Sequence, residues 1–172
     1  MAETRAFLRA FAKRESDPGY ILKMLNEELV SDLDETHIVT LILVRINPAR
    51  NILDYSSAGH IPAYLVNSTG EVIHTLKSTG IPLGLIAGET FLRSETITLK
   101  SGNILALLTD GITESLAKDE SEFGHDRMME VINSHRKDTA WEITNHLNQA
   151  VYSFTDQHHQ EDDITSIICK VN

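Results

Sequence analysis

The 172-residue sequence has a single cysteine, few aromatic residues and no long apolar run. One cysteine, Cys169, excludes an intramolecular disulfide framework and fits a reducing, cytoplasmic setting. Cys169 lies in the apolar run 164–171, so we expect a small packing residue rather than a nucleophile. No stretch approaches the roughly 18 apolar residues that a membrane-spanning helix requires. The N-terminal segment also lacks the apolar core of a secretory signal.

Basic residues are also scarce. The chain has 15 Lys and Arg against 25 Asp and Glu, which gives a net charge of −10. Nucleic acids and anionic membranes attract proteins through a positive field, so we expect neither as a partner. Hydrophobic residues make up 41% of the chain, an ordinary value for a globular protein. At about 150 residues per domain, the length predicts one domain over residues 1–172.

Apolar periodicity predicts two helices followed by a series of strands. The first helix covers about 3–13, and the second begins at Pro18 with Asp17 as its N-cap. Residues 38–44 are β-branched and almost continuously apolar, which predicts a strand buried on both faces. Further strands are predicted at 52–57, 63–66, 71–76, 91–99 and 104–108, with a loop at 78–90.

After residue 108 the pattern becomes helical. It predicts a short helical turn at 114–117, a helix at 126–134 and a third helix that begins with the capping box Thr139–Glu142. Trp141, in the first turn of that helix, is expected to be a packing residue. A final strand is predicted at 164–171. The order of helices, strands, helices and strand predicts an α+β fold with mainly antiparallel strands.

Acidic residues lie at the ends of two predicted strands. Asp110 follows Thr109 just after the predicted strand 104–108. Asp162 and Asp163 precede the last strand. Carboxylates gathered at strand ends can bind hard divalent cations such as Mg²⁺ or Mn²⁺. The alternative is that Asp110 is a turn residue and that Asp162 and Asp163 lie in a solvated loop. His158 and His159 nearby are expected to belong to the same loop rather than to bind metal.

Four short motifs occur in order along the chain. They are Ser57–Leu65 (SAGHIPAYL), Gly80–Leu85 (GIPLGL), Leu107–Glu114 (LLTDGITE, followed by Phe123-Gly124) and Asp162–Thr165 (DDIT). In order and spacing these motifs resemble segments of the SpoIIE/RsbU-like bacterial branch of the metal-dependent PPM (type 2C) protein serine/threonine phosphatases. The resemblance spans nearly the whole chain.

The resemblance implies both a fold and a reaction. The fold is a two-sheet antiparallel β-sandwich flanked by helices, with two Mn²⁺ or Mg²⁺ ions at one end of the sheets. Members of the family hydrolyse phosphoserine or phosphothreonine on proteins by means of a metal-bridged water, so no side chain acts as nucleophile. By motif, the implied metal-site residues are Asp110, Gly111, Asp162 and, ranked below Asp162, Asp163. Anti-sigma-factor antagonists are frequent bacterial substrates, which implies a signalling role in sigma-factor partner switching.

The sequence departs from the family pattern at its beginning. The family has an early acidic pair and a Gly-Asp loop whose aspartate bridges both metals. Here no Gly-Asp pair precedes Asp110, and the first glycine is Gly19. We therefore expect an N-terminally truncated domain that binds one metal weakly or none, has little activity, and dimerises through uncovered sheet edges. The alternative is a non-catalytic module that binds a phospho-regulated partner.

Overall fold

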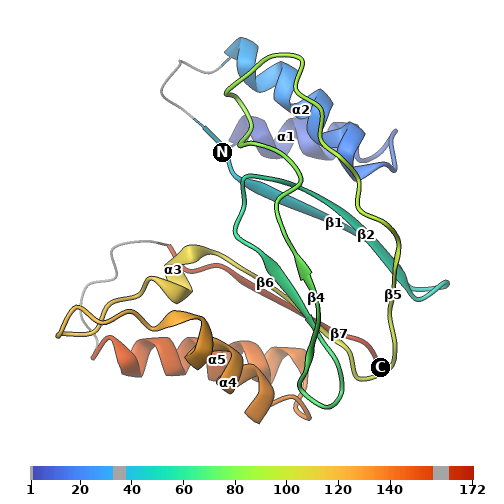
Figure 1. Cartoon of the computed structure of the whole chain (residues 1–172). Coiled ribbons are helices and arrows are strands. Elements are labelled where there is room, and N and C mark those ends of the chain that lie inside the picture. Colours follow the sequence, from blue (N-terminus) through green and yellow to red (C-terminus); the bar gives the residue numbers. More distant parts are fainter. Residues whose placement is uncertain (1, 33–37, 157–162) are drawn as a thin grey trace. The chain divides into compact units, whose positions relative to one another are not determined.

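The computed structural model describes residues 2–32, 38–156 and 163–172, which form two compact units (Figure 1). Unit 1 comprises residues 1–60 and 77–99, and unit 2 comprises residues 61–76 and 100–172. Each unit has its own antiparallel sheet and its own helices. Because each unit combines two separate stretches of the chain, neither corresponds to one contiguous segment of sequence.

Unit 1 contains two helices and a three-stranded sheet. Its elements are α1 (Ala2–Phe11), α2 (Pro18–Asp32), β1 (Leu41–Asn47), β2 (Ile52–Ala58) and β5 (Ile97–Thr98). The strand order is β1-β2-β5, and both pairings are antiparallel. Helix α2 packs against β1 and β2, with α1 beside it (Figure 1). The buried core residues are Leu22, Leu25, Leu29, Ala58, Leu83 and Phe91.

The start of α2 follows directly from its sequence. Asp17 Oδ1 accepts hydrogen bonds from the backbone N–H groups of Gly19, at 2.8 Å, and Tyr20, at 3.1 Å. These are two of the donors that the first turn of a helix leaves without an intrahelical partner. The predicted N-cap is confirmed, and the two predicted helices correspond to α1 and α2.

The strand predicted over 38–44 differs from the observed one. β1 begins at Leu41, and its residues are half-buried or exposed. Leu41 and Leu43 pack against the core of unit 1, but β1 is the outer strand of its sheet. The prediction of burial on both faces is therefore wrong, because an unbroken apolar run does not distinguish an outer strand from a central one.

The strand predicted over 91–99 shrinks to the two residues of β5. The Ser94 N–H donates to the Tyr55 carbonyl at 2.8 Å, as a ladder bond would. The Tyr55 N–H, however, donates to Ser94 Oγ at 3.0 Å rather than to a backbone carbonyl. Phe91 is buried in the core against Gly80, where an added Cβ would lie 2.7 Å from the Phe91 ring. A side-chain hydrogen bond thus takes the place of the ladder, and the strand prediction is wrong before residue 97.

Unit 2 contains a four-stranded sheet and three helices. Its elements are β3 (Ala63–Val66), β4 (Val72–Leu76), β6 (Ile104–Leu108), α3 (Asp110–Thr113), α4 (Gly124–Ser134), α5 (Ala140–Phe154) and β7 (Ser166–Lys170). The strand order is β4-β3-β6-β7, with antiparallel pairing throughout. Helices α4 and α5 pack against each other, and α5 packs along β7 (Figure 1). The buried core is formed by Val66, Ile104, Ala106, Leu108, Ile112, Phe123, Met128, Met129, Ile132, Ile143, Leu147 and Val151.

The helical predictions for unit 2 are confirmed at α5 and wrong at α3. Thr139 Oγ1 accepts from the Glu142 N–H, and Glu142 Oε2 accepts from the Thr139 N–H at 2.8 Å, so the capping box is complete. The short helix is at 110–113 rather than at 114–117, and Asp110 is therefore its first residue. Trp141 is 73% exposed, so its predicted packing role is wrong.

The observed architecture confirms the predicted class, an α+β fold with two antiparallel sheets and flanking helices. Across the described ranges, no helix is long and apolar enough to cross a membrane.

Candidate metal centre and family of the chain

The pairing of β6 with β7 brings the two acidic motifs to the same end of the unit 2 sheet. Leu108, the last residue of β6, lies opposite Ser166, the first residue of β7. Beyond this pair, the Thr109 N–H donates to the Thr165 carbonyl at 3.0 Å, and the Thr165 N–H donates to Thr109 Oγ1 at 2.9 Å. The Thr109 hydroxyl also donates to the Asp163 carbonyl at 3.2 Å. Asp110 and Asp163 therefore flank one hydrogen-bonded sheet end.

The predicted ligands differ in their surroundings. Asp110 is half-buried, and its Oδ1 accepts from the Gly111 N–H at 3.0 Å. Gly111 is buried, and its carbonyl accepts from the Ser115 hydroxyl at 2.6 Å. Asp163 is exposed, and Asp162 lies outside the described residues. Each carboxylate can accept about four hydrogen bonds or metal bonds, so Asp110 retains acceptor capacity beyond its bond to Gly111.

Apolar packing fixes the position of Asp110. Ile112, two residues further on in α3, is fully buried in the core of unit 2. Phe123, which follows the loop after α3, is also buried and meets Phe154 of α5 edge to face, with ring centroids 5.4 Å apart. The short helix is thus anchored by its own residue Ile112 and by Phe123, which follows the next loop. This packing holds α3, and with it Asp110, at the end of the sheet.

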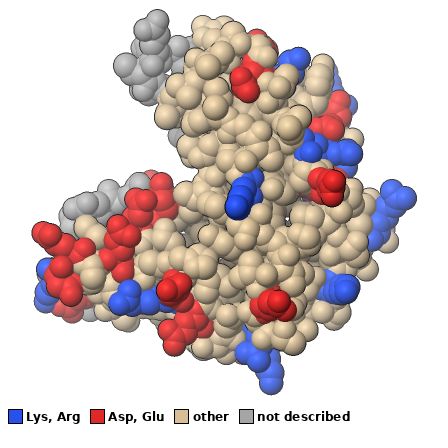
Figure 2. Space-filling view, viewed as in Figure 1, with Lys and Arg blue, Asp and Glu red and all other residues tan. Residues whose placement is uncertain are grey.

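The loop after α3 is strongly acidic, and Figure 2 shows acidic side chains gathered on this part of unit 2. Two hydrogen bonds from Ser121, from its hydroxyl and from its N–H, lower the pKa of Asp119. A negative field of this kind attracts cations and opposes a phosphate group unless a cation lies between them. The exposed acidic residues here are Glu114, Asp119, Glu120, Glu122 and Asp126.

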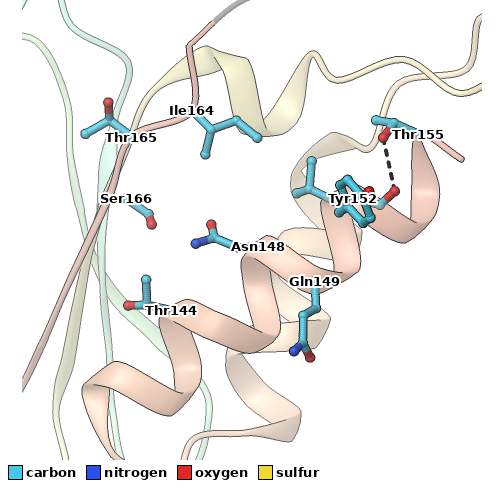
Figure 3. A pocket seen from close by; sticks show the side chains of 9 residues that line it. Thr144, Asn148, Gln149, Tyr152, Thr155, Ile164, Thr165 and Ser166 are labelled. Carbon is cyan, nitrogen blue, oxygen red and sulfur yellow. Dashed lines mark hydrogen bonds between the residues drawn. The ribbon is translucent and has the colours of Figure 1, made fainter. Parts of the chain in front are cut away.

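A groove of about 850 Å³ runs between α5 and the start of β7 (Figure 3). Thr144 and Asn148 of α5 face Ser166 across it. Its wall includes Thr165, which is hydrogen-bonded to Thr109 beside Asp110, so the groove adjoins the acidic sheet end. The volume falls in the range of small-ligand sites. The lining residues are Thr144, Asn148, Gln149, Val151, Tyr152, Thr155, Ile164, Thr165 and Ser166.

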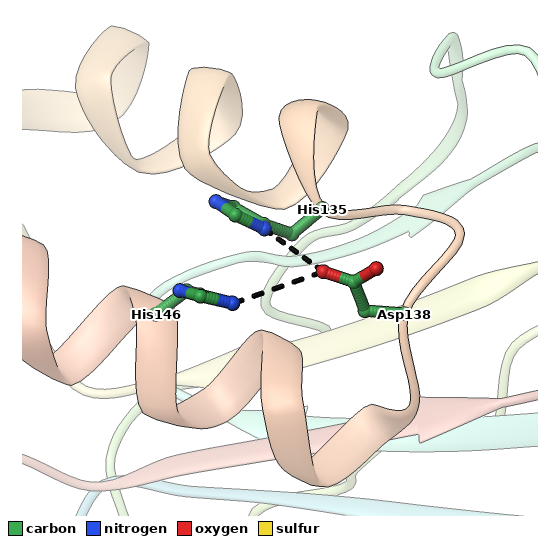
Figure 4. A group of neighbouring side chains, drawn as sticks. All are labelled: His135, Asp138 and His146. Atoms are coloured by element: carbon green, nitrogen blue, oxygen red, sulfur yellow. Dashed lines mark hydrogen bonds and ion pairs between the residues drawn. The ribbon is translucent and has the colours of Figure 1, made fainter.

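The structure also brings together three residues that sequence reasoning missed. They are His135, which directly follows α4, Asp138 in the loop after it and His146 of α5, and they lie together at the α4–α5 junction (Figure 4). Their metal-ligating atoms lie within 4.8 Å of one another. The spacing of two and seven intervening residues carries no recognised metal signature. It becomes informative only once the turn between the helices is known.

The comparisons with known proteins decide the family. The family model described as Stage II sporulation protein E (SpoIIE) matches residues 1–172. The chain belongs to the SpoIIE family. The resemblance expected from the four motifs is confirmed.

Relatives of this SpoIIE-family chain include Protein IcfG of Synechocystis, which is 32% identical over 134 residues. That match covers 78% of this chain and 21% of IcfG. The phosphoserine phosphatase RsbU of Bacillus subtilis is 24% identical over 155 residues, covering 89% of this chain and 45% of RsbU. The chain therefore spans less than half the length of either relative.

Solved structures agree with the fold of this SpoIIE-family chain. The SiaA-PP2C domain of Pseudomonas aeruginosa superposes with a TM-score of 0.84 at 22% identity, covering 98% of this chain and 68% of that one. A crystal structure of RsbX in complex with magnesium superposes with a TM-score of 0.68 at 19% identity, covering 97% of this chain and 71% of that one. The PP2C fold is thereby established.

Proposed function

We propose that this chain is the phosphatase domain, or a part of it, of a protein that removes phosphate from phosphoserine or phosphothreonine on another protein. The observation that carries the proposal is the position of Asp110 and Asp163 at the same hydrogen-bonded end of β6 and β7. The matching family model and a relative named as a phosphoserine phosphatase support it.

The donor atoms at this sheet end fit Mg²⁺ or Mn²⁺. Asp110, Gly111, Asp162 and Asp163 would supply carboxylate and carbonyl oxygens, the donors that hard divalent cations prefer. A bound cation of this kind lowers the pKa of water and neutralises the charge of phosphoryl oxygens. The chain's own residues position these donors. The hydrogen bonds of Thr109 hold the segments next to β6 and β7 together, and Ile112 anchors α3 in the core.

The groove between α5 and β7 gives the proposed substrate a place beside this sheet end. Its polar side chains, among them Asn148 and Ser166, can bind the backbone of a peptide that carries the phosphorylated residue. We propose a phosphorylated anti-sigma-factor antagonist as the substrate, which would place the chain in a partner-switching pathway. A cytoplasmic location and a homodimer formed through sheet edges belong to the same proposal.

The experiment measures phosphate release from a serine-phosphorylated antagonist protein in the presence of Mn²⁺. The expected result is slow release that stops on addition of EDTA and in Asp110→Asn. A matched control is Asp126→Asn, which removes one of the exposed acidic side chains at the start of α4. Equal release by wild type and Asp110→Asn would contradict the proposed site.

A second function, binding of a phospho-regulated partner without catalysis, is favoured by the small number of ligands. Among the residues that the structure describes, Asp110 belongs to no group of three or more His, Cys, Asp or Glu ligands. The two described carboxylates, Asp110 and Asp163, leave most of the six positions of Mg²⁺ or Mn²⁺ to other donors and water, which predicts weak binding. A complex with the phosphoprotein that survives EDTA, without phosphate release, would support this function. Loss of that complex in EDTA would contradict it.

A further inference from the structure

The three residues His135, Asp138 and His146 form a compact group of nitrogen and oxygen donors. His135 Nδ1 lies 2.9 Å from Asp138 Oδ2, and His146 Nε2 lies 3.8 Å from the same oxygen (Figure 4). The two imidazole rings are stacked, with centroids 3.6 Å apart. Both imidazole nitrogens therefore point toward the same carboxylate oxygen of Asp138 (Figure 4).

These two distances are close to those between the ligands of a small metal site. Ligands of a tetrahedral zinc ion, each about 2.0–2.2 Å from the metal, lie roughly 3.4 Å from one another. The two observed distances lie on either side of this value. The side chains are 33%, 39% and 39% exposed, so the rings have room to rotate toward one ion and water can reach a fourth position. Three protein ligands and a water are a common zinc coordination.

The backbone around the group is already fixed. The capping box of Thr139 and Glu142 sets the start of α5, about two turns before His146. Lys170 of β7 donates to the carbonyls of Arg136, at 2.9 Å, and Asp138, at 2.6 Å. The loop that carries Asp138 is thereby tied both to α5 and to the sheet. A ligand set on a fixed backbone loses little conformational entropy when it binds.

The group is separate from the acidic sheet end. Lys170, which ties the loop of Asp138, is the last residue of β7, whereas Thr165 at the acidic end precedes the first. Five residues of strand correspond to about 17 Å. The donors also differ in chemistry, because imidazole nitrogens favour Zn²⁺ over Mg²⁺ or Mn²⁺. We propose that His135, Asp138 and His146 form a second, zinc-binding site, distinct from the proposed phosphatase centre.

The test is a calorimetric titration of the chain with Zn²⁺, repeated with Co²⁺ and read by visible absorption. The expected result is one equivalent of Zn²⁺ and the strong absorption of four-coordinate Co²⁺. His135→Gln and His146→Gln should each weaken Zn²⁺ binding by about tenfold or more, since loss of an outer-shell partner alone can cost about tenfold. Asp110→Asn should leave Zn²⁺ binding unchanged.

His74→Gln is the matched control, because His74 is an exposed histidine on β4 of the same unit. It should bind Zn²⁺ as the wild type does. Thermal melts without metal show whether each variant folds, and only the wild type and the two controls should gain stability when Zn²⁺ is added. Absence of Zn²⁺ binding, or equal binding by wild type and both His135→Gln and His146→Gln, would overturn the proposal and leave the group a set of polar contacts at the α4–α5 junction.

Discussion

Gly59, in the first of the four motifs, occupies a position that excludes any side chain. Its φ of +64° is in the left-handed region, and an added Cβ would lie 2.5 Å from Cγ of Pro82. The Gly59 N–H donates to the Gly80 carbonyl at 2.9 Å and to Ser78 Oγ at 2.8 Å, which holds the backbone in place. We expect Gly59→Ala to lower the free energy of unfolding, measured in urea, by about 2–3 kcal/mol through backbone strain and overlap with Pro82.

Gly88 offers the matched control for this prediction. Its φ is +76°, but an added Cβ would have no atom within 4 Å. Gly88→Ala should therefore cost only the backbone term, about 1 kcal/mol. Equal losses in the two variants would show that contact with Pro82 contributes nothing.

The ion pair between Arg45 and Asp54 joins β1 to β2 in unit 1. Arg45 Nη2 lies 2.6 Å from Asp54 Oδ2, and the hydrogen bond with Asp54 is the main cause that raises the pKa of Arg45. The Asp54 side chain is only 4% exposed, whereas that of Arg45 is 40% exposed. Arg45→Met leaves the carboxylate without its partner, and we expect a loss of about 1–2 kcal/mol in urea unfolding, reduced by the access of water on the arginine side. Arg50→Met, in the exposed turn after β1, should be neutral.

Burial raises the pKa of the Cys169 thiol on β7. A raised thiol pKa leaves less thiolate at pH 8, so iodoacetamide should react several-fold more slowly with the folded chain than with the same chain in urea. The thiol has its lower pKa in the unfolded chain and therefore ionises there first as pH rises. The stability that the buried, protonated thiol contributes is present below the unfolded pKa and is lost as pH rises toward the folded value. Cys169 is the single cysteine, so the rate reports on one site. Equal rates in both states would contradict the prediction.

At the scale of the element, the start of α5 is the feature with a clear pH dependence. Hydrogen bonds from the Thr139 N–H and hydroxyl lower the pKa of Glu142. A carboxyl with a lowered folded pKa stabilises the fold above its unfolded pKa, about 4.3, and this contribution is lost as pH falls through the folded value. The melting temperature of Glu142→Gln should therefore lie below that of the wild type at pH 7 and approach it near pH 3. A difference that persists at pH 3 would contradict this account.

The elements that the sequence predicts well are those whose own residues determine them. β3 and β6 have the predicted bounds, and α5 begins at the predicted capping box, because alternation, apolar runs and caps act locally. The elements that the sequence predicts wrongly depend on contacts with residues far away in the chain. Ser94 replaces a ladder bond to Tyr55 from 39 residues away, and α3 forms at Asp110 because Ile112 packs into a core built by α4 and α5. Neither contact can be predicted from the residues that neighbour it in the sequence.

The candidate site likewise has features that the sequence predicts and features that it does not. Asp110 and Asp163 can each be placed at a strand end from the sequence, and the family resemblance relates them. Their meeting at one edge depends on the pairing of β6 with β7, which are about 60 residues apart in the chain. The group of His135, Asp138 and His146 escapes prediction altogether, because the loop that brings it together is held by Lys170 from another strand.

At the scale of the molecule, a net charge of −10 favours cations overall, so net charge alone does not select a site. The type of donor atom determines which metal each site prefers. The acidic sheet end offers oxygen atoms, and the α4–α5 junction offers two imidazole nitrogens and one carboxylate. These sets suit Mn²⁺ and Zn²⁺ respectively. The two proposed sites can thus bind metals of different character within unit 2 without competing.

A double set of variants tests this independence. Asp110→Asn should weaken Mn²⁺ binding by about tenfold or more and leave Zn²⁺ binding unchanged, whereas His146→Gln should do the reverse. The physical reason is separation along the sheet: the two groups are tied to opposite ends of β7. That strand is about 17 Å long, which exceeds the range of about 7–10 Å over which substitutions couple and the Debye length of about 8 Å at physiological salt. Calorimetric titrations of the four combinations of variant and metal provide the measurement. If His146→Gln also weakened Mn²⁺ binding while the fold stayed intact, the two sites would be coupled through the sheet, and the metal at the α4–α5 junction would be a regulator of the proposed phosphatase centre.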